Sequence, residues 1–356
     1  MSDLSPFEEM RGYLRAIGQG PRAGRDLTRE EARAAIELIL DGGATPAQAG
    51  GFLLLQRYKG ESVEELLGFL DAYRSRASLI RPAVEGLLDI GSPYDGRKKS
   101  IVVSPASAIV VAAAGVPVVL HGEKDLGPKH GVPVGDVLEA LGVDTDAEPA
   151  AVQRAIETDG LGYMHQARFV PDVARMRQLR EEVALRTVFA TVEKVANLAG
   201  ASYSVIGLAH LPYKDKMLEA AAANEFKRVL LVQGIEGNED VPTSRACRAF
   251  LRENGETTEL RIDAAEYGLQ PATQEEMAGG DARHNAEIAE RILSGEKGAF
   301  RDLITLNAGV RLWLAERAPD IGAGLEMARE AIDSGAARDK LGEVRGAGEE
   351  QGARSK

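Results

Sequence analysis

From residue 87 onward, the sequence alternates short apolar runs with longer stretches of helical periodicity. This alternation is typical of a parallel sheet whose strands are joined by helical crossovers. Residues 87–120 contain a complete strand, helix, strand unit, and the pattern resumes after residue 203. The expected strands are residues 87–90, 101–103, 116–120, 203–208, 228–233 and 259–262. The expected helices are residues 106–114, 134–141, 284–295, 299–316 and 322–334.

The N-terminal 80 residues show a different pattern, which predicts a small helical bundle. Capping boxes begin at Thr28, Thr45 and Ser62, each with a glutamate or glutamine three residues later. In a capping box these two side chains satisfy free N–H groups at the start of a helix. Apolar residues around Phe52 and Phe69 suit a bundle core and a surface for a second copy, so a homodimer is expected.

Three parts are therefore expected along the chain. Residues 1–80 form a helical domain, joined by helices from about residues 150–185, which lack strand character. Residues 81–340 form an α/β domain with a mainly parallel central sheet flanked by helices. Residues 341–356 form a flexible tail, because the sequence from Ala336 onward is charged and rich in glycine.

Charge and cysteine content narrow the class of protein. Lysine and arginine number 43 and aspartate and glutamate 55, and the net charge of −12 disfavours binding to nucleic acid or anionic membranes. The single cysteine, Cys247, excludes an intramolecular disulfide and fits a reducing compartment. No run of about 18 apolar residues is present, so we expect no membrane partner and a cytoplasmic location.

Two stretches are basic within this acidic chain. Residues 97–130 and residues 160–180 each carry three more basic than acidic side chains. This distribution indicates an anion pocket if the two stretches meet in the fold. The alternative is a pair of solvated basic surfaces.

Several motifs carry a resemblance to a known family. They are the run from Leu27 to Ala32 and the segments Lys59-Gly-Glu-Ser62, Asp89-Ile-Gly91, Asp136-Val-Leu-Glu-Ala-Leu-Gly142, Gly234-Ile-Glu-Gly237 and Leu306-Asn-Ala308. In order and spacing they resemble anthranilate phosphoribosyltransferases, over about residues 8–340. The superfamily also includes pyrimidine nucleoside phosphorylases and a divergent branch, one member of which binds nucleic acid.

The resemblance implies a Mg²⁺-dependent enzyme that transfers a phosphoribosyl group from phosphoribosyl pyrophosphate (PRPP) to a small acceptor. The acceptor is unidentified, and an aromatic molecule is one option. Because the donor is a polyanion, its site needs backbone N–H groups, cations and Mg²⁺ to stabilise the leaving pyrophosphate. Two alternatives stay open: a non-catalytic nucleic-acid-binding protein, and an enzyme of the pyrimidine nucleoside phosphorylase type.

The first loop of the implied donor site departs from the family pattern. Residues 91–96 read Gly-Ser-Pro-Tyr-Asp-Gly where the family has Gly-Thr-Gly-Gly-Asp. Pro93 has no N–H and a fixed φ, so the loop loses one donor. The substrate-binding candidates that remain are Gly91, Ser92 and Asp95. The alternative is an ordinary strand-to-helix turn.

Further substrate-binding candidates follow from the resemblance. Ser104 is what remains of the family motif Asn-x-Ser-Thr, although a serine here also suits a helix N-cap. His121 and Gly122 match the family's Lys-His-Gly-Asn, with leucine and glutamate in place of the lysine and the asparagine. For His121 the alternative is a structural histidine. Lys124 and Lys129 are expected to compensate for the lost cation.

The last candidates concern the acceptor and the metal. Arg180 matches the arginine with which the family holds the anthranilate carboxylate, where a planar fork suits bidentate pairing. Arg186 is expected to support the fold. Glu239 and Asp240 match, in swapped order, the acid pair that holds Mg²⁺, and both are hard oxygen ligands. Without the resemblance they would be interpreted as surface acids.

Overall fold

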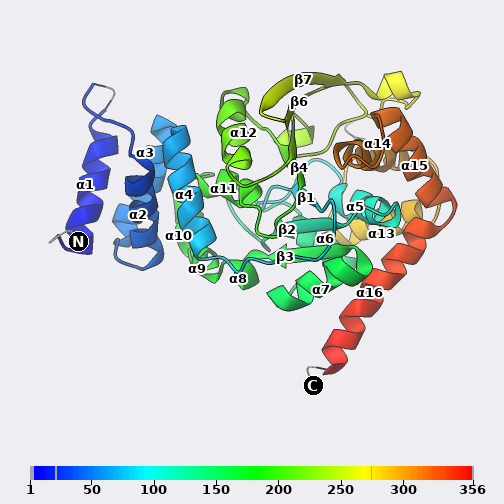
Figure 1. The fold of residues 1–356 in the computed structure, drawn as a ribbon, viewed down its shortest axis with the longest axis horizontal. Coiled ribbons are helices and arrows are strands. Elements are labelled where there is room, and N and C mark those ends of the chain that lie inside the picture. Colours follow the sequence, from blue (N-terminus) through cyan, green and yellow to red (C-terminus); the bar gives the residue numbers. More distant parts are fainter. Residues whose placement is uncertain (1–3, 21, 274, 355–356) are drawn as a thin grey trace.

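The computed structural model describes residues 4–20, 22–273 and 275–354, and shows an N-terminal helical bundle beside a larger α/β domain (Figure 1). The three predicted capping boxes at Thr28, Thr45 and Ser62 all form, with both hydrogen bonds of each box present. The bundle consists of α1 (Pro6–Gly18), α2 (Arg29–Leu40), α3 (Pro46–Lys59) and α4 (Val63–Ser75).

A seven-stranded sheet forms the centre of the α/β domain, in the order β3-β2-β1-β4-β5-β6-β7. The first five strands in this order are parallel, and β6 and β7 are antiparallel at one edge. The predicted fold class, a helical bundle with a mainly parallel α/β domain, is confirmed. The strands are β1 (Leu88–Gly91), β2 (Val118–Gly122), β3 (Leu161–His165), β4 (Tyr203–Gly207), β5 (Arg228–Val232), β6 (Cys247–Glu253) and β7 (Glu256–Ile262).

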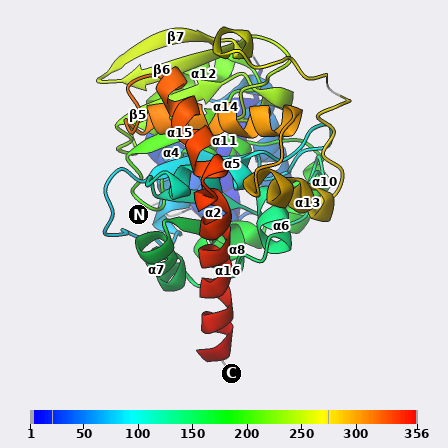
Figure 2. The same cartoon turned by 90° about the vertical axis from the view of Figure 1, so that its right-hand side faces the viewer.

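Helices cover both faces of this sheet, as Figures 1 and 2 show. The longer helices of this domain are α5 (Ser104–Ala113), α6 (Val134–Ala140), α7 (Pro149–Asp159), α10 (Arg177–Val183), α11 (Phe189–Val195), α12 (Lys214–Ala222), α13 (Ala282–Leu293), α14 (Ala299–Leu314), α15 (Ile321–Asp333) and α16 (Ala336–Arg354). The short helices are α8 (Gln166–Phe169) and α9 (Pro171–Ala174), with 3₁₀ turns η1 (Leu211–Tyr213), η2 (Ile235–Gly237) and η3 (Ala264–Tyr267).

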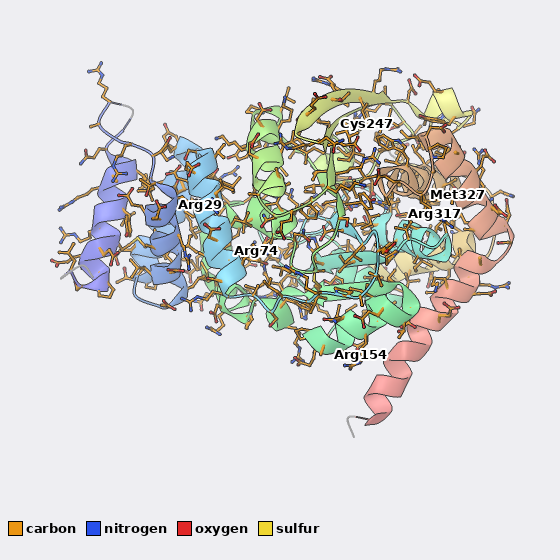
Figure 3. All side chains as sticks on the ribbon, in the orientation of Figure 1. Arg29, Arg74, Arg154, Cys247, Arg317 and Met327 are labelled. Carbon is orange, nitrogen blue, oxygen red and sulfur yellow. The ribbon has the colours of Figure 1, made fainter. Side chains whose placement is uncertain are left out.

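The bundle and one face of the sheet share a single hydrophobic core. Successive strand residues point to opposite faces, so Leu230 packs in the core with α5 and α14, whereas Leu231 packs in the core that contains Phe52 and Phe69 of the bundle. Arg74 of α4 lies where the bundle meets the α/β domain (Figure 3), and its guanidinium donates to the carbonyl oxygen of Asn197 at 2.9 Å. The bundle is thus fixed against the α/β domain.

Two strands were missed by sequence reasoning, and one predicted strand is absent. Residues 101–103 form no strand, because their N–H groups are satisfied elsewhere: Ile101 donates to the Met277 carbonyl and Val102 to the Asn285 side chain. β3 lies in the segment that was predicted to lack strands. A hairpin turn at Asn254 and Gly255, both at positive φ, connects β6 to its antiparallel neighbour β7. An Asn-Gly pair is a typical hairpin signal, so the sequence did carry a sign of β6.

The prediction of a flexible tail is wrong for the start of α16. Ala337, Leu341 and Val344 are buried. Their spacing of four and three residues places them on one helix face, which joins the same core as α5 and α14. Figure 2 shows the far end of α16 projecting from the domain.

None of the described helices is long and apolar enough to cross a membrane. The homodimer and the cytoplasmic location stay predictions.

Close contact between α2 and α4 depends on Gly68. A Cβ atom there would lie 2.2 Å from the carbonyl oxygen of Arg29, so the helices would have to separate. We expect Gly68→Ala to lower the free energy of unfolding by about 1–3 kcal/mol, measured by urea denaturation. Gly12→Ala is the matched control, since nothing lies within 4 Å of its Cβ position, and it should stabilise the protein by up to about 1 kcal/mol. Equal effects of the two changes would contradict this packing.

Candidate active site

A cavity of about 580 Å³ lies between the bundle and the ends of the parallel strands. Gly207, which ends β4, lines it, as do Asp95 and Lys99 in the loop after β1. Arg57 contributes from the bundle. Ligand sites of open α/β sheets lie at the carboxyl ends of the strands, so this cavity is the candidate active site.

The lining of the cavity is basic. Arg57, Lys99, Lys129, Arg186 and Lys194 face it, against the acids Glu61, Asp95 and Glu236. Two of the cations form ion pairs. Lys129 Nζ lies 2.6 Å from Glu236 Oε2, and Arg186 forms a bidentate ion pair with Asp95 at 2.7 and 2.8 Å. Within the part of the chain that the structure describes, the other three cations make no ion pair. The cavity is therefore suited to an anion.

Lys194 has the most unusual environment of these cations. Its amine donates to the Gly207 carbonyl at 3.1 Å and is shielded from bulk water, although the residue keeps some surface towards the cavity. Burial and the nearby Arg186 lower the pKa of Lys194 to about 8. A bound anion would restore the full charge of this amine.

Two glycines bring the loop that carries Lys129 to the loop after β1. Gly96 has φ +69°, and a Cβ there would lie 2.5 Å from the backbone of Gly131. Next to this contact, the Arg97 N–H donates to the Val132 carbonyl at 3.0 Å. The Val132 N–H donates to the Arg97 carbonyl at 2.8 Å. These contacts hold the two loops together at the edge of the cavity.

Of the predicted substrate-binding residues, only Asp95 and Lys129 line this cavity. Arg180 lies beside it, on a smaller cavity of about 50 Å³. Lys124 pairs with Glu139 at 2.6 Å, away from the cavity. The other predicted residues are buried outside this cavity, at strand ends or in hydrogen bonds with Glu239, Tyr94 and Asp89. They are Gly91, Ser92, Ser104, His121 and Gly122.

The loop after β1 is filled by its own side chains. Tyr94 is buried, and its hydroxyl lies 2.9 Å from His121 Nδ1. His121 Nε2 lies 3.2 Å from an oxygen of Asp89, so we assign the proton to Nε2 and let Nδ1 accept from the tyrosine. Burial raises the pKa of Tyr94 and keeps its phenol protonated. This geometry supports the structural alternative for His121.

Glu239 and Asp240 are fully buried rather than at the surface. Arg97 Nη2 lies 2.8 Å from Glu239 and its Nη1 contacts Asp240, while Arg311 Nη2 lies 2.6 Å from Asp240. Ser92 donates to Glu239 at 2.5 Å. Burial alone would raise the pKa of Glu239, but Arg97, Arg311 and the serine hydroxyls lower it below its usual value. Burial and the neighbouring Glu239 raise the pKa of Asp240, against the opposing effect of Arg97 and Arg311. Because guanidinium groups contact both acids, we assign a negative charge to each.

Ser104 also binds this acid pair instead of capping a helix. Val103 is the N-cap residue of α5 and makes no side-chain cap bond. Ser104 is instead the first residue of α5, and its hydroxyl donates to Glu239. The predicted N-cap role is wrong.

Magnesium does not fit the acid pair in this arrangement. Two guanidinium groups already neutralise the two carboxylates, and a divalent ion would add two positive charges in a buried site. No group of three His, Cys, Asp or Glu side chains among the described residues could hold a metal. The metal site predicted at Glu239 and Asp240 is therefore not supported by the geometry.

Arg180 is occupied by an internal partner. Its guanidinium contacts both oxygens of buried Glu193, one at 3.2 Å, and lies 5.7 Å from the Phe189 ring centre. Gln166 also donates to Glu193, at 2.7 Å. To hold an acceptor carboxylate, Arg180 would have to share or leave this pair.

Sequence reasoning missed Lys194, Arg57 and His210 as cavity residues. The sequence offered one signal for Lys194: it stands with Glu193 in an otherwise apolar run, between Val192 and Val195. Burying charged side chains costs free energy unless they form ion pairs or hydrogen bonds, so such a pair indicates a partner or a functional role. For Arg57 and His210 the sequence carried no comparable signal.

Removing Arg180 tests whether it is mainly structural. Arg180→Ala leaves Glu193 buried without its cation, so we expect a loss of about 3–5 kcal/mol in the free energy of unfolding, measured by chemical denaturation. The control is Arg175→Ala, which removes a side chain that is 67% exposed and should cost less than about 1 kcal/mol. Unchanged stability of the Arg180 variant would show that this pair does not support the fold.

Comparison with known proteins agrees with both parts of the fold. Residues 11–77 match the helical bundle domain of the glycosyl transferase family, and residues 88–338 match its a/b domain. An anthranilate phosphoribosyltransferase of Sinorhizobium medicae is 34% identical over 342 residues, which are 96% of this chain and 97% of that protein.

Solved structures show the same architecture. The anthranilate phosphoribosyltransferase of Thermus thermophilus is 30% identical, with a TM-score of 0.84 over 96% of this chain and 100% of that one. The Saccharomyces cerevisiae enzyme in complex with PRPP and Mg shares the fold at 18% identity, with a TM-score of 0.83 over 96% of this chain and 98% of that one. This chain therefore belongs to the glycosyl transferase family, as an anthranilate phosphoribosyltransferase-like member.

Proposed function

We propose that this protein transfers a phosphoribosyl group from PRPP to a small aromatic acceptor in the cavity between the bundle and the sheet. The observation that carries the proposal is the set of cations that line this cavity at the carboxyl ends of the strands, within an acidic chain. Family membership supplies the reaction type.

The charges of the cavity suit the donor. Transfer develops negative charge on the leaving pyrophosphate, and fixed cations stabilise that charge without having to reorganise. Lys99 and Lys194 are free of ion pairs among the described residues, and Lys129 stands beside them on the lining. We assign the pyrophosphate to these three lysines. Because the buried side chain of Tyr94 fills the loop after β1, that loop offers no room for the pyrophosphate. The basic lining of the cavity is therefore the anion site that we propose.

The remaining lining suits an aromatic acceptor. Leu185, Val188, Leu208 and Met217 provide apolar surface, and Tyr213 adds an aromatic ring. Flat aromatic molecules gain most from contact with such walls. Donor and acceptor would then meet between the basic and the apolar sides.

Binding and turnover can be measured separately. We expect PRPP to bind in isothermal titration, and pyrophosphate to be released only when an aromatic amine from a panel is also present. Lys129→Ala should weaken PRPP binding about 10- to 100-fold, the value of one charge-assisted contact. Lys124→Ala should leave binding unchanged, since that lysine lies outside the cavity. The absence of heat at millimolar PRPP would refute the proposal.

The pH dependence of binding tests the place of Lys194. Its pKa of about 8 in the free protein means that the amine loses its charge as pH rises through that value, while the donor phosphates are already fully ionised above about pH 7. PRPP affinity should therefore fall between about pH 7 and about pH 9.5, on either side of that pKa. With Lys194→Arg the affinity should stay constant over this range, because arginine remains charged.

Lys194→Met completes the comparison. It should bind weakly at every pH, because the cation is absent throughout. A wild-type affinity that does not change across the pKa of Lys194, together with normal binding by Lys194→Met, would place the anion elsewhere.

A further inference from the structure

We infer that the Arg97 guanidinium takes the place of a divalent cation between Glu239 and Asp240, so that this protein binds its anionic ligand without Mg²⁺. The nature of the ligand rests on the proposed function, but the position of Arg97 does not. The inference concerns a cation that is built into the chain.

Arg97 bridges the two acids from one side. Its side chain is only 2% exposed and both carboxylates are fully buried. One nitrogen, Nη2, lies 2.8 Å from Glu239, and the other, Nη1, contacts Asp240. A planar guanidinium can bind two carboxylates at once, as a metal ion would.

The charges of the cluster balance without a metal. Arg97 and Arg311 supply two positive charges and the acids two negative ones, while Ser92 and Ser104 donate hydroxyl hydrogens to Glu239. Ionised acids beside an anion cavity would repel the ligand unless they were neutralised. Arg97 supplies that neutralisation permanently, whereas a metal would have to be bound from solution.

Arg97 is also held in place by contacts other than the acids. Nη1 donates to the Ile101 carbonyl at 3.0 Å and Nη2 to the Ser104 hydroxyl at 3.2 Å. Its backbone is fixed to Val132 by two hydrogen bonds. The guanidinium therefore cannot swing out to admit a hydrated ion without breaking the contacts that hold it in the loop.

The cluster lies directly next to the proposed anion site. Arg97 stands between Asp95 and Lys99 in the chain, and both of these line the cavity. The same loop thus directs Arg97 towards the buried acids and Lys99 towards the cavity. A metal-independent anion site follows from this arrangement.

Mn²⁺ binding, detected by electron paramagnetic resonance, tests the inference without any sugar ligand. We expect the wild-type protein to show no saturable site below millimolar Mn²⁺. Arg97→Ala, which leaves Glu239 without a cation and Asp240 with Arg311 alone, should bind one Mn²⁺ at least tenfold more tightly and gain thermal stability from it. Arg301→Ala is the control, because it removes another buried arginine, paired with Asp333, that contacts no acid pair. Saturable wild-type binding that Glu239→Gln abolishes would overturn the inference, as would an Arg97→Ala variant that binds no Mn²⁺.

Arg97→Gln serves as a second variant in case Arg97→Ala does not fold. Arg97→Gln keeps part of the side chain and its hydrogen bonds but removes the charge, so it should gain the same Mn²⁺ site. The absence of that site in a folded Arg97→Gln protein counts against the inference.

PRPP titration with Mg²⁺ and with EDTA supplies the second readout. Equal wild-type affinity in both conditions is expected, and binding that requires Mg²⁺ would overturn the inference. If PRPP does not bind in either condition, the proposed function fails, and the Mn²⁺ result still decides the role of Arg97.

Discussion

The buried cluster of Arg97, Arg311, Glu239 and Asp240 holds the centre of the α/β domain together. Its members come from the loop after β1, from α14 and from the loop after β5, so one set of ion pairs joins three distant parts of the chain. Removing one partner from such a cluster leaves an uncompensated buried charge, which is costly. The positions of the loops around the cavity depend on this cluster, because Arg97 also carries the backbone contact to Val132.

The cavity itself follows from the sharing of a core between bundle and sheet. Alternate residues of the central strands belong to the same hydrophobic core as the bundle, and the cavity opens between the bundle and the carboxyl ends of the strands. Arg57 and Glu61 enter the lining from the bundle, while α11 and α12 supply Lys194 and Met217. A site between two domains can bring together groups that neither domain would hold alone.

The loop after β1 departs from the Gly-Thr-Gly-Gly-Asp pattern of the family that the sequence resembles. Glycines at these positions would leave backbone N–H groups open to a ligand, whereas here Tyr94 is buried and its hydroxyl lies 2.9 Å from His121 Nδ1. In the proposed function, the positive charge for the phosphorylated donor comes instead from lysine side chains of the neighbouring cavity. Side-chain cations and backbone N–H groups are alternative means to the same electrostatic end.

The sequence by itself determined the helix starts of the bundle, most of the parallel strands and the fold class, because capping boxes and apolar periodicity are local signals that the printed residues carry directly. It also showed that the chain has basic stretches. It could not show that the acids Glu239 and Asp240 face arginines rather than solvent or a metal, or that Lys194 rather than Lys124 reaches the cavity. Those outcomes depend on which distant side chains meet after folding, and partners such as Arg97 and Glu239, 142 residues apart, are brought together only by the tertiary structure.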